Sequence, residues 1–267
     1  MVAKLLSIAG SDSGGGAGLQ ADLKAASALG VYAMSAVTAV TAQNTRGVTD
    51  VVLMSPSMLR AQIRACLDDI GADAIKIGML GSAELVRVVA EEIAGFAGPV
   101  VLDPVMIAKS GDALLAKEAV AALTSDLLPL ASLLTPNLPE AACLLGLPEA
   151  QEADEAQARA LRALGPKAVL LKGGHATGPV CTDLLLAEQV SYFTAPRCVT
   201  RHTHGTGCSL ASAVAAGLAL GQPLPQAVVR AHGWLQGAIR AAQGLQIGQG
   251  HGPVHHFHEI WPMEALA

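Results

Sequence analysis

Apolar runs of strand length alternate along the chain with longer stretches in which apolar residues recur every three or four positions. Short apolar runs are typical of buried strands, and the periodic stretches are typical of helices that bury one face. The predicted strands are 3–9, 32–40, 74–77, 99–102, 132–134 and 168–171, with an edge hairpin over 180–193. The predicted helices are 18–29, 57–70, 82–93, 114–128, 139–145, 152–164, 207–220 and 226–242. This alternation predicts an α/β protein whose mostly parallel sheet is covered on both faces.

Length and composition narrow the class of protein. The chain has 267 residues, within the range of about 250–300 that one hydrophobic core can serve, so we expect a single domain over 1–267. Apolar residues make up 52% and charged residues 15%, which excludes a disordered chain. The net charge of −5 argues against nucleic acid or a membrane surface as a partner, and 3% aromatic residues leave no base-stacking platform.

Cysteine usage and the N-terminal segment point to the cytoplasm. The mean hydropathy is +0.45, and the uncharged stretches 25–45 and 205–229 have the length of a membrane span. Polar residues, glycines and prolines interrupt both, so each is interpreted as two buried elements joined by a turn. No signal peptide is present, and the five cysteines include no CxxC pair, as expected of reduced thiols. The histidines of the tail 251–258 lack a familiar metal spacing, which favours a structural segment.

Polar clusters follow directly on the predicted strands. Ligands of open parallel sheets bind beyond the carboxyl ends of the strands, so these clusters are expected to converge on one rim. They are 10–18, 41–44, 78–79, 103–105, 135–140 and 172–175. The glycine-rich segment 10–18 lets backbone approach a ligand closely, but it has neither GxGxxG spacing nor a Walker A motif. A flexible turn between strand and helix is an equal alternative for it.

The segment 204–208 reads His-Gly-Thr-Gly-Cys and precedes an apolar helix. Free N–H groups at a helix start can form an anion site, and an ordinary glycine-containing helix start is the alternative. Cys208 is expected in the first turn, where the pKa of a thiol should be lowered and its thiolate character increased. A small buried hydrophobe is the alternative for this cysteine.

Five further polar residues are candidates for binding. Lys172 stands at a strand end, where its ammonium can meet a phosphate. Asp103 and Glu140 carry carboxylates that can hold a hydrated Mg²⁺, directly or through water. The amide of Gln43 suits a heterocycle that carries both donors and acceptors. Asp22 lies about one turn into the first predicted helix and is expected to face the same rim. The alternatives are helix caps and solvated loop side chains.

These motifs, in this order, resemble those of the hydroxymethylpyrimidine/phosphomethylpyrimidine kinases of thiamine biosynthesis, within the ribokinase superfamily. The resemblance rests on the segments 8–24, 35–45, 76–80, 102–112, 135–142, 172–175, 203–208 and 252–257. It implies a three-layer α/β/α fold and two successive ATP-dependent phosphorylations of 4-amino-5-hydroxymethyl-2-methylpyrimidine, first to the monophosphate and then to the diphosphate. ATP and Mg²⁺ are the implied cofactors. The apolar composition is compatible with a homodimer.

The resemblance also implies a pyrimidine pocket made of Gly10, Asp22, Gln43, Met79 and Val105. In that pocket Gln43 would read the aminopyrimidine edge. Met79 and Val105 would pack on the ring, and Asp22 would address its polar substituents.

A second implied group lies near Mg²⁺ and the ATP phosphates and comprises Asp103, Asn137, Glu140, Lys172 and Thr206. Asp103 and Glu140 are the implied metal ligands. The implied catalytic residues are Lys172, the anion hole Gly205, Thr206 and Gly207, and Cys208. Cys208 would stand beside the reacting hydroxyl as its base, where many ribokinase relatives have Asp. His202 stands where members of this branch often have Asn, which would alter the loop on the nucleotide side.

Two other functions stay open at this point. Some relatives with the same HGTGC motif phosphorylate B6 vitamers, which are similar in size and also carry a hydroxymethyl group, so a pyridoxal-type kinase is the nearest alternative. A non-catalytic vitamin or nucleotide sensor that kept the fold is the other. The presence together of Lys172, Glu140 and Cys208 speaks against a sensor.

Overall fold

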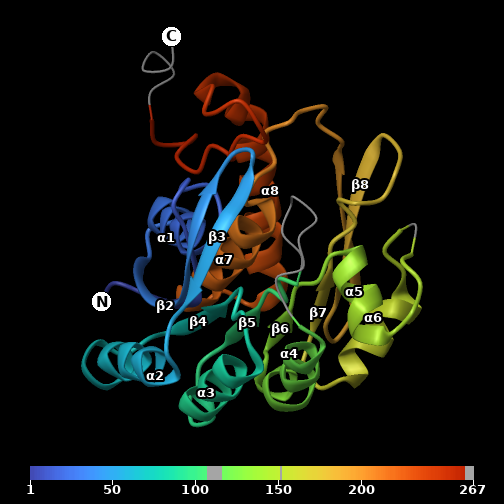
Figure 1. Ribbon diagram of the computed structural model, residues 1–267. Helices are drawn as coiled ribbons and strands as arrows, with labels where there is room; N and C mark the ends of the chain where they lie inside the picture. The colour runs from blue at the N-terminus through green and yellow to red at the C-terminus, as the bar shows by residue number, and fades with distance from the viewer. Residues whose placement is uncertain (107–115, 151, 262–267) are drawn as a thin grey trace.

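The centre of the molecule is a nine-stranded sheet, seen in a computed structural model that describes residues 1–106, 116–150 and 152–261 (Figure 1). Buried apolar runs form the central strands, as the sequence predicts. The strands are β1 (Lys4–Asp12), β2 (Tyr32–Asn44), β3 (Gly47–Leu53), β4 (Ala74–Ile77), β5 (Val100–Leu102), β6 (Leu133–Leu134), β7 (Val169–Leu171), β8 (Val180–Leu186) and β9 (Val190–Pro196).

The sheet is parallel in its middle and antiparallel at both edges. The strand order is β3-β2-β1-β4-β5-β6-β7-β8-β9. All neighbours from β2 through β7 pair in parallel, whereas β3 pairs antiparallel with β2, and β8 and β9 add an antiparallel hairpin beyond β7. The predictions of a mostly parallel sheet and of an edge hairpin are therefore confirmed. The carboxyl ends of β1, β2, β4, β5, β6 and β7 all lie along one edge of the sheet.

Helices follow most of the central strands. They are α1 (Gly18–Ala28), α2 (Pro56–Ala65), α3 (Ala83–Ile93), α4 (Lys117–Ala122), α5 (Leu138–Leu145), α6 (Glu155–Ala163), α7 (Thr206–Ala219) and α8 (Leu224–Ala241). Single π-helical segments extend α2 over Cys66–Ile70 and α4 over Leu123–Leu127, so that two of the predicted helices change their winding halfway. The predicted start of α4, at 114–115, lies outside the described residues.

Strand side chains alternate between two separate apolar cores, because successive residues of a strand point to opposite faces. In β1, Leu5 packs with residues of α1, α7 and α8, and its neighbour Leu6 packs with residues of α2 to α6. Figure 1 shows α1, α7 and α8 together on one side of the sheet and α2, α3 and α4 on the other. The molecule thus has three layers with helices on both faces, as predicted. In the described residues no helix has the length and apolar character that a bilayer span requires.

Two elements differ from the sequence-based expectation near the edge formed by β3. The strand predicted to end at residue 40 continues to Asn44, and β3 itself is not predicted. The side chains of Val51, Val52 and Leu53 are 41%, 60% and 42% exposed. The apolar run of this segment, 51–54, is at the short limit for a strand and directly follows the polar residues Thr49 and Asp50, so the sequence signal for a strand is weak. Together β2 and β3 form an antiparallel hairpin, whose pairing extends the sheet along the polar residues at the end of β2.

Side chains cap the starts of α2, α3, α5 and α6. The helix predicted from residue 152 begins at Glu155, because the side chain of Asp154 accepts a hydrogen bond of 2.8 Å from the N–H of Gln157. A side-chain oxygen placed this way satisfies one of the free N–H groups of the first turn. The same rule places the start of α2 after Ser55, which accepts from the N–H of Met58.

Candidate active site

A cavity of about 650 Å³ lies at the edge of the sheet where the parallel strands end. Segments that are far apart in the sequence meet there because their strands are neighbours in the sheet. All but one of the predicted site residues line it, and these are Gly10, Gln43, Met79, Asp103, Val105, Asn137, Glu140, Lys172, Gly205, Thr206, Gly207 and Cys208. The convergence of the polar clusters on one rim is therefore confirmed. Asp22 is the exception.

One half of the cavity, which we call the phosphate half, is built on a buried ion pair between Asp103, directly after β5, and Lys172, directly after β7. Lys172 Nζ lies 2.8 Å from Asp103 Oδ1, and Thr135, directly after β6, donates its hydroxyl to the same oxygen at 2.9 Å. Burial opposes ionisation of both groups. The charges of Lys172 and Lys76 outweigh it and lower the pKa of Asp103, and Asp103 in turn raises the pKa of Lys172. Both groups are charged at neutral pH.

Glu140 belongs to the same half and also caps a helix. The N–H of Asn137 donates to Glu140 Oε2 at 2.8 Å, and the N–H of Glu140 donates to Asn137 Oδ1 at 2.8 Å. This reciprocal pair is a capping box at the start of α5. Burial, opposed by Lys172 and reinforced by Asp103, raises the pKa of Glu140 to about 7. The side chain is therefore a buried acid whose charge is not fully balanced by the protein.

The start of α7 closes the phosphate half. Its N-cap, Gly205, has a φ of 79°, and a Cβ there would lie 1.8 Å from the carbonyl oxygen of Gly16, so glycine is required. A Cβ on Gly207 would lie 3.3 Å from Lys172 Nζ and 3.6 Å from Asp103 Oδ2. The ammonium of Lys172 thus faces the first turn of α7. An anion between them would meet an ammonium and the positive end of a helix together.

The thiol of Cys208 differs from the sequence-based expectation. Burial, reinforced by Asp22 and Asp103 and opposed by Lys76 and by a hydrogen bond from Gly18, raises its pKa to about 11. The expectation of a lowered pKa is wrong because the helix start acts on a thiol that is fully enclosed beside two carboxylates. Cys208 lines the cavity as a neutral thiol at neutral pH.

Asp22 is fully buried and is not among the residues that line the cavity, so its contact with ligand substituents stays a prediction. Lys76 Nζ lies 2.9 Å from both oxygens of the Asp22 carboxylate, which also accepts from Ser7 Oγ at 2.6 Å and Ser212 Oγ at 2.7 Å. Both members of this ion pair are fully buried. Lys76 borders the cavity in place of Asp22. Burial acts to lower the pKa of Lys76, but the charge of Asp22 outweighs burial and raises that pKa. The only sequence signal for Lys76 was a charge inside an otherwise apolar strand.

The other half, which we call the ring half, consists of neutral side chains against β1 and β2. The thioether of Met79 lies against Gly10, and the hydroxyl of Thr38 fixes the Met79 backbone by donating to its carbonyl oxygen at 2.6 Å. Gln43 is half-buried at the end of β2, and Val105 follows β5. An apolar surface beside one amide suits a flat heterocycle with polar groups on one edge.

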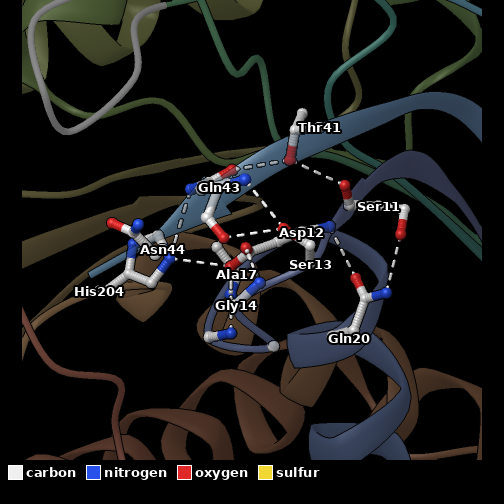
Figure 2. A network of polar contacts seen from close by, with 12 residues as sticks. Ser11, Asp12, Ser13, Gly14, Ala17, Gln20, Thr41, Gln43, Asn44 and His204 are labelled. Carbon is white, nitrogen blue, oxygen red and sulfur yellow. Dashed lines mark hydrogen bonds and ion pairs between the residues drawn. The ribbon is translucent and has the colours of Figure 1, made fainter. Parts of the chain in front are cut away.

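A hydrogen-bond network joins the ring half to the start of α7 (Figure 2). Asp12 accepts from the N–H groups of Gly14, Gly16 and Ala17 at 2.8–3.0 Å, and its Oδ2 lies 2.9 Å from His204 Nε2. Burial would raise the pKa of Asp12, but His204 and these N–H groups outweigh it and lower that pKa. The sequence did not predict either side chain as part of the site. An Asp before three glycines signals a local turn, but nothing local signals a partner 192 positions away.

The C-terminal tail supports this network from outside. The carbonyl oxygen of Gly252 accepts from the N–H of His204 at 3.0 Å, and His204 pairs with Pro253 as an isolated bridge. The ring of His202 lies against Gly252, is buried, and does not line the cavity. The tail is thus in place as a structural segment beside the site.

The two carboxylates of the phosphate half suit a hydrated divalent cation. Mg²⁺ is commonly held by one or two carboxylates together with substrate phosphates. In the part of the chain that the structure describes, no group of three or more His, Cys, Asp or Glu side chains is placed to hold a metal. Asp103 and Glu140, whose negative charge the protein does not fully balance, fit an arrangement of two carboxylates together with substrate phosphates. Part of the motif 102–112 lies outside the described residues.

Comparison with known proteins assigns the chain to a family. Residues 12–255 match the family described as "Phosphomethylpyrimidine kinase". The chain belongs to this family. It is 53% identical over 266 residues to the hydroxymethylpyrimidine/phosphomethylpyrimidine kinase of Rhizobium meliloti (strain 1021), covering 98% of this chain and 99% of that protein.

Among solved structures, this family member is similar to the phosphomethylpyrimidine kinase of Clostridium difficile, with 40% identity and a TM-score of 0.78, covering 90% of this chain and 100% of that one. It is also similar to an ADP complex of Bacillus subtilis pyridoxal kinase, with 34% identity and a TM-score of 0.87, covering 96% of this chain and 98% of that one. The ribokinase-like fold implied by the resemblance is therefore confirmed. Kinases of two different vitamins share it, so the fold alone does not select the substrate.

Proposed function

We propose that this protein is an ATP-dependent kinase of thiamine biosynthesis that phosphorylates 4-amino-5-hydroxymethyl-2-methylpyrimidine to its monophosphate and then to its diphosphate. The observation that carries this proposal is that one cavity joins two chemically different halves. Gln43 offers a donor and an acceptor to a ring, and Lys172 lies against the start of α7, where both border the same cavity and can meet a phosphoryl group together. Family membership and the 53% identity support the pyrimidine over a B6 vitamer.

Phosphoryl transfer depends mainly on positioning and on stabilising negative charge. The oxygen of the substrate hydroxymethyl group forms a bond to the γ-phosphorus as the bond from that phosphorus to the β–γ bridging oxygen breaks, and ADP leaves. Lys172 and the N–H groups of Gly205–Gly207 stabilise the oxygens of the transferring group, because they are fixed before the reaction begins. When bound, Mg²⁺ supplies further positive charge to the phosphates, and Asp103 and Glu140 are the residues that would hold it.

Cys208 is assigned to the reacting hydroxyl, and the two steps distinguish its possible roles. Only the first step must remove a proton from an alcohol, since the attacking phosphate of the second step is already ionised. Cys208→Ala is therefore expected to slow the first step more than the second. Because the pKa of the thiol is about 11, the wild-type rate of the first step should rise with pH above neutrality. Equal losses in both steps, with an unchanged pH profile, would assign a positioning role instead.

The deciding experiment incubates the protein with ATP, Mg²⁺ and the free pyrimidine alcohol, and counts phosphates on the product by mass. We expect the monophosphate first and the diphosphate later. Parallel reactions with pyridoxal test the nearest alternative, which predicts a B6 monophosphate and no pyrimidine diphosphate. A sensor would consume no ATP with either substrate. A cytoplasmic location and a homodimer stay predictions.

A further inference from the structure

The side-chain amide of Gln43 is held between two polar neighbours, while its backbone is fixed separately. Ser13 Oγ donates to the carbonyl oxygen of Gln43 and accepts from its N–H, both at 2.8 Å. In Figure 2 the amide oxygen Oε1 faces Thr41 Oγ1, at 3.1 Å, and the amide nitrogen Nε2 faces His204 Nε2, at 3.4 Å. A half-turn of the amide exchanges its oxygen and nitrogen between these neighbours. The other hydrogen bonds of Thr41 and His204 therefore decide which atom faces each.

Thr41 must accept from Gln43. Its Oγ1 lies 2.9 Å from the carbonyl oxygen of Ser11, which can only accept. The single hydroxyl proton of Thr41 is used in that bond. Toward Gln43 the hydroxyl then presents a lone pair, which requires the amide nitrogen there.

His204 Nε2 cannot accept a hydrogen bond from Gln43. Its Nε2 lies 2.9 Å from Asp12 Oδ2, a carboxylate oxygen that already accepts from the N–H groups of Gly16 and Ala17. A carboxylate only accepts, so Nε2 carries a proton whether the imidazole is neutral or charged. That proton is used toward Asp12, and a protonated ring nitrogen has no lone pair to accept from an amide N–H. The amide oxygen, rather than the amide nitrogen, therefore suits the position beside His204 Nε2.

Two independent constraints thus demand the same orientation, with Gln43 Nε2 beside Thr41 and Oε1 beside His204. We propose that Thr41 and the Asp12–His204 pair are positioning residues that lock the Gln43 amide in this orientation and thereby set which ring the cavity accepts. This rests on the proposed function, which assigns Gln43 to the ring. The lock connects the ring half directly to the segment that begins α7.

The locked amide distinguishes a 4-amino ring from a 4-oxo ring. His204 immediately precedes Gly205, the N-cap of α7. In the proposed orientation the acceptor Oε1 therefore lies at the end of the amide that faces the transfer site. The reacting hydroxymethyl group sits on C5, which places the 4-amino group at this end and ring N3 beside the donor Nε2. A 4-oxo ring has an acceptor at C4 and a donor at N3. The C4 oxygen of such a ring would face the acceptor Oε1, and its N3–H would face the donor Nε2, so neither hydrogen bond could form.

The kinetic test compares kcat/KM for the 4-amino alcohol and its 4-oxo analogue at saturating ATP. Wild-type protein should prefer the 4-amino ring, and Thr41→Val should reduce this preference about tenfold, the effect of one hydrogen bond. Thr41→Ser, which keeps the hydroxyl, should restore the preference. Thr49→Val is the matched control, because Thr49 also donates to a backbone carbonyl, that of Ala42 at 3.0 Å, on the same hairpin. It should keep the wild-type ratio.

Equal losses for both rings in Thr41→Val, with the ratio unchanged, would overturn the lock. A second readout needs no substrate. Nitrogen-15 NMR of the His204 ring, assigned with His204→Gln, should show a proton on Nε2 in the free protein. A ring protonated on Nδ1 alone would also overturn the lock. Failure to phosphorylate either pyrimidine would instead refute the proposed function, so the two failures are distinguishable.

Discussion

The two halves of the cavity are stabilised in different ways. The phosphate half concentrates charge away from water, with Lys172, Asp103 and Glu140 held at strand and helix ends. Its charges are incompletely balanced, as the raised pKa of Glu140 reveals. In the ring half, by contrast, Thr41 and Gln43 have partners within the protein that satisfy their hydrogen-bonding groups in one arrangement.

This difference separates rate from selectivity. Unbalanced buried charge is stabilised when ligands of opposite charge arrive, so the phosphate half is suited to act on bound phosphates and cations. A network held in one arrangement by its internal hydrogen bonds excludes a ring with the wrong pattern of donors and acceptors. Substitutions in the phosphate half should therefore change kcat, and substitutions in the ring half should change the preference between rings.

The largest expected effect tests this separation directly. Lys172→Met removes the ammonium that faces α7 and should lower kcat by roughly 10²–10³-fold, as loss of a fixed charge-stabilising group does. The preference for the 4-amino over the 4-oxo ring should not change. Steady-state kinetics with both rings measure the two quantities together. Lys167→Met, at the exposed residue before the same strand, is the control and should leave kcat unaltered. A changed ring preference in Lys172→Met would break the comparison.

A pH effect of intermediate size should come from Glu140. Its pKa is raised from 4.5 to about 7 in the folded protein, mainly by burial. The folded state therefore binds this proton more tightly than the unfolded state. Its contribution to stability is complete below about pH 4.5 and is lost as the pH rises to about 7, by about 3 kcal/mol.

Urea unfolding without ATP or Mg²⁺, at several pH values, measures this loss. Glu140→Gln is the matched variant, since Gln also serves in a capping box while carrying no titrating group. The free energy of unfolding of wild-type protein should fall relative to that of Glu140→Gln across this range. Parallel curves for the two proteins would contradict the unbalanced charge assigned to the phosphate half.

The smallest expected effect concerns the close backbone contact between Gly205 and Gly16, which lies between the two halves of the cavity. Gly205→Ala adds a Cβ that would lie 1.8 Å from the Gly16 carbonyl oxygen, in addition to the strain of a positive φ. Gly30→Ala is the control, because Gly30 has a φ of 84° and nothing within 4 Å of its Cβ position. Gly30→Ala should cost about 1 kcal/mol of unfolding free energy, and Gly205→Ala roughly twice that or more. Equal losses of unfolding free energy in the two variants would show that the contact between Gly205 and Gly16 tolerates the added Cβ.

The central strands were predictable because their pattern is local. The runs that become β5 and β7 are apolar and buried on both faces, and the polar residues that follow them stand at the sheet edge in any parallel arrangement. The edge strand β3 was missed because only its second half is apolar, and its place in the sheet depends on pairing with β2 and not on burial of its side chains. The cap of α5 illustrates a residue with two roles, since Glu140 satisfies a helix start and also faces the cavity.

Local order along the chain was enough to predict the layered fold and the rim on which the polar segments meet, and together with the family resemblance it named twelve of the residues that line the cavity. Contacts between distant segments decided the rest. Asp22 is neutralised by a lysine 54 positions away, Asp12 meets His204 across 192 positions, and the thiol of Cys208 keeps its proton because folding encloses it beside carboxylates. Protonation and hydrogen-bond direction depend on which charges and lone pairs surround a group, and no run of neighbouring residues contains that information.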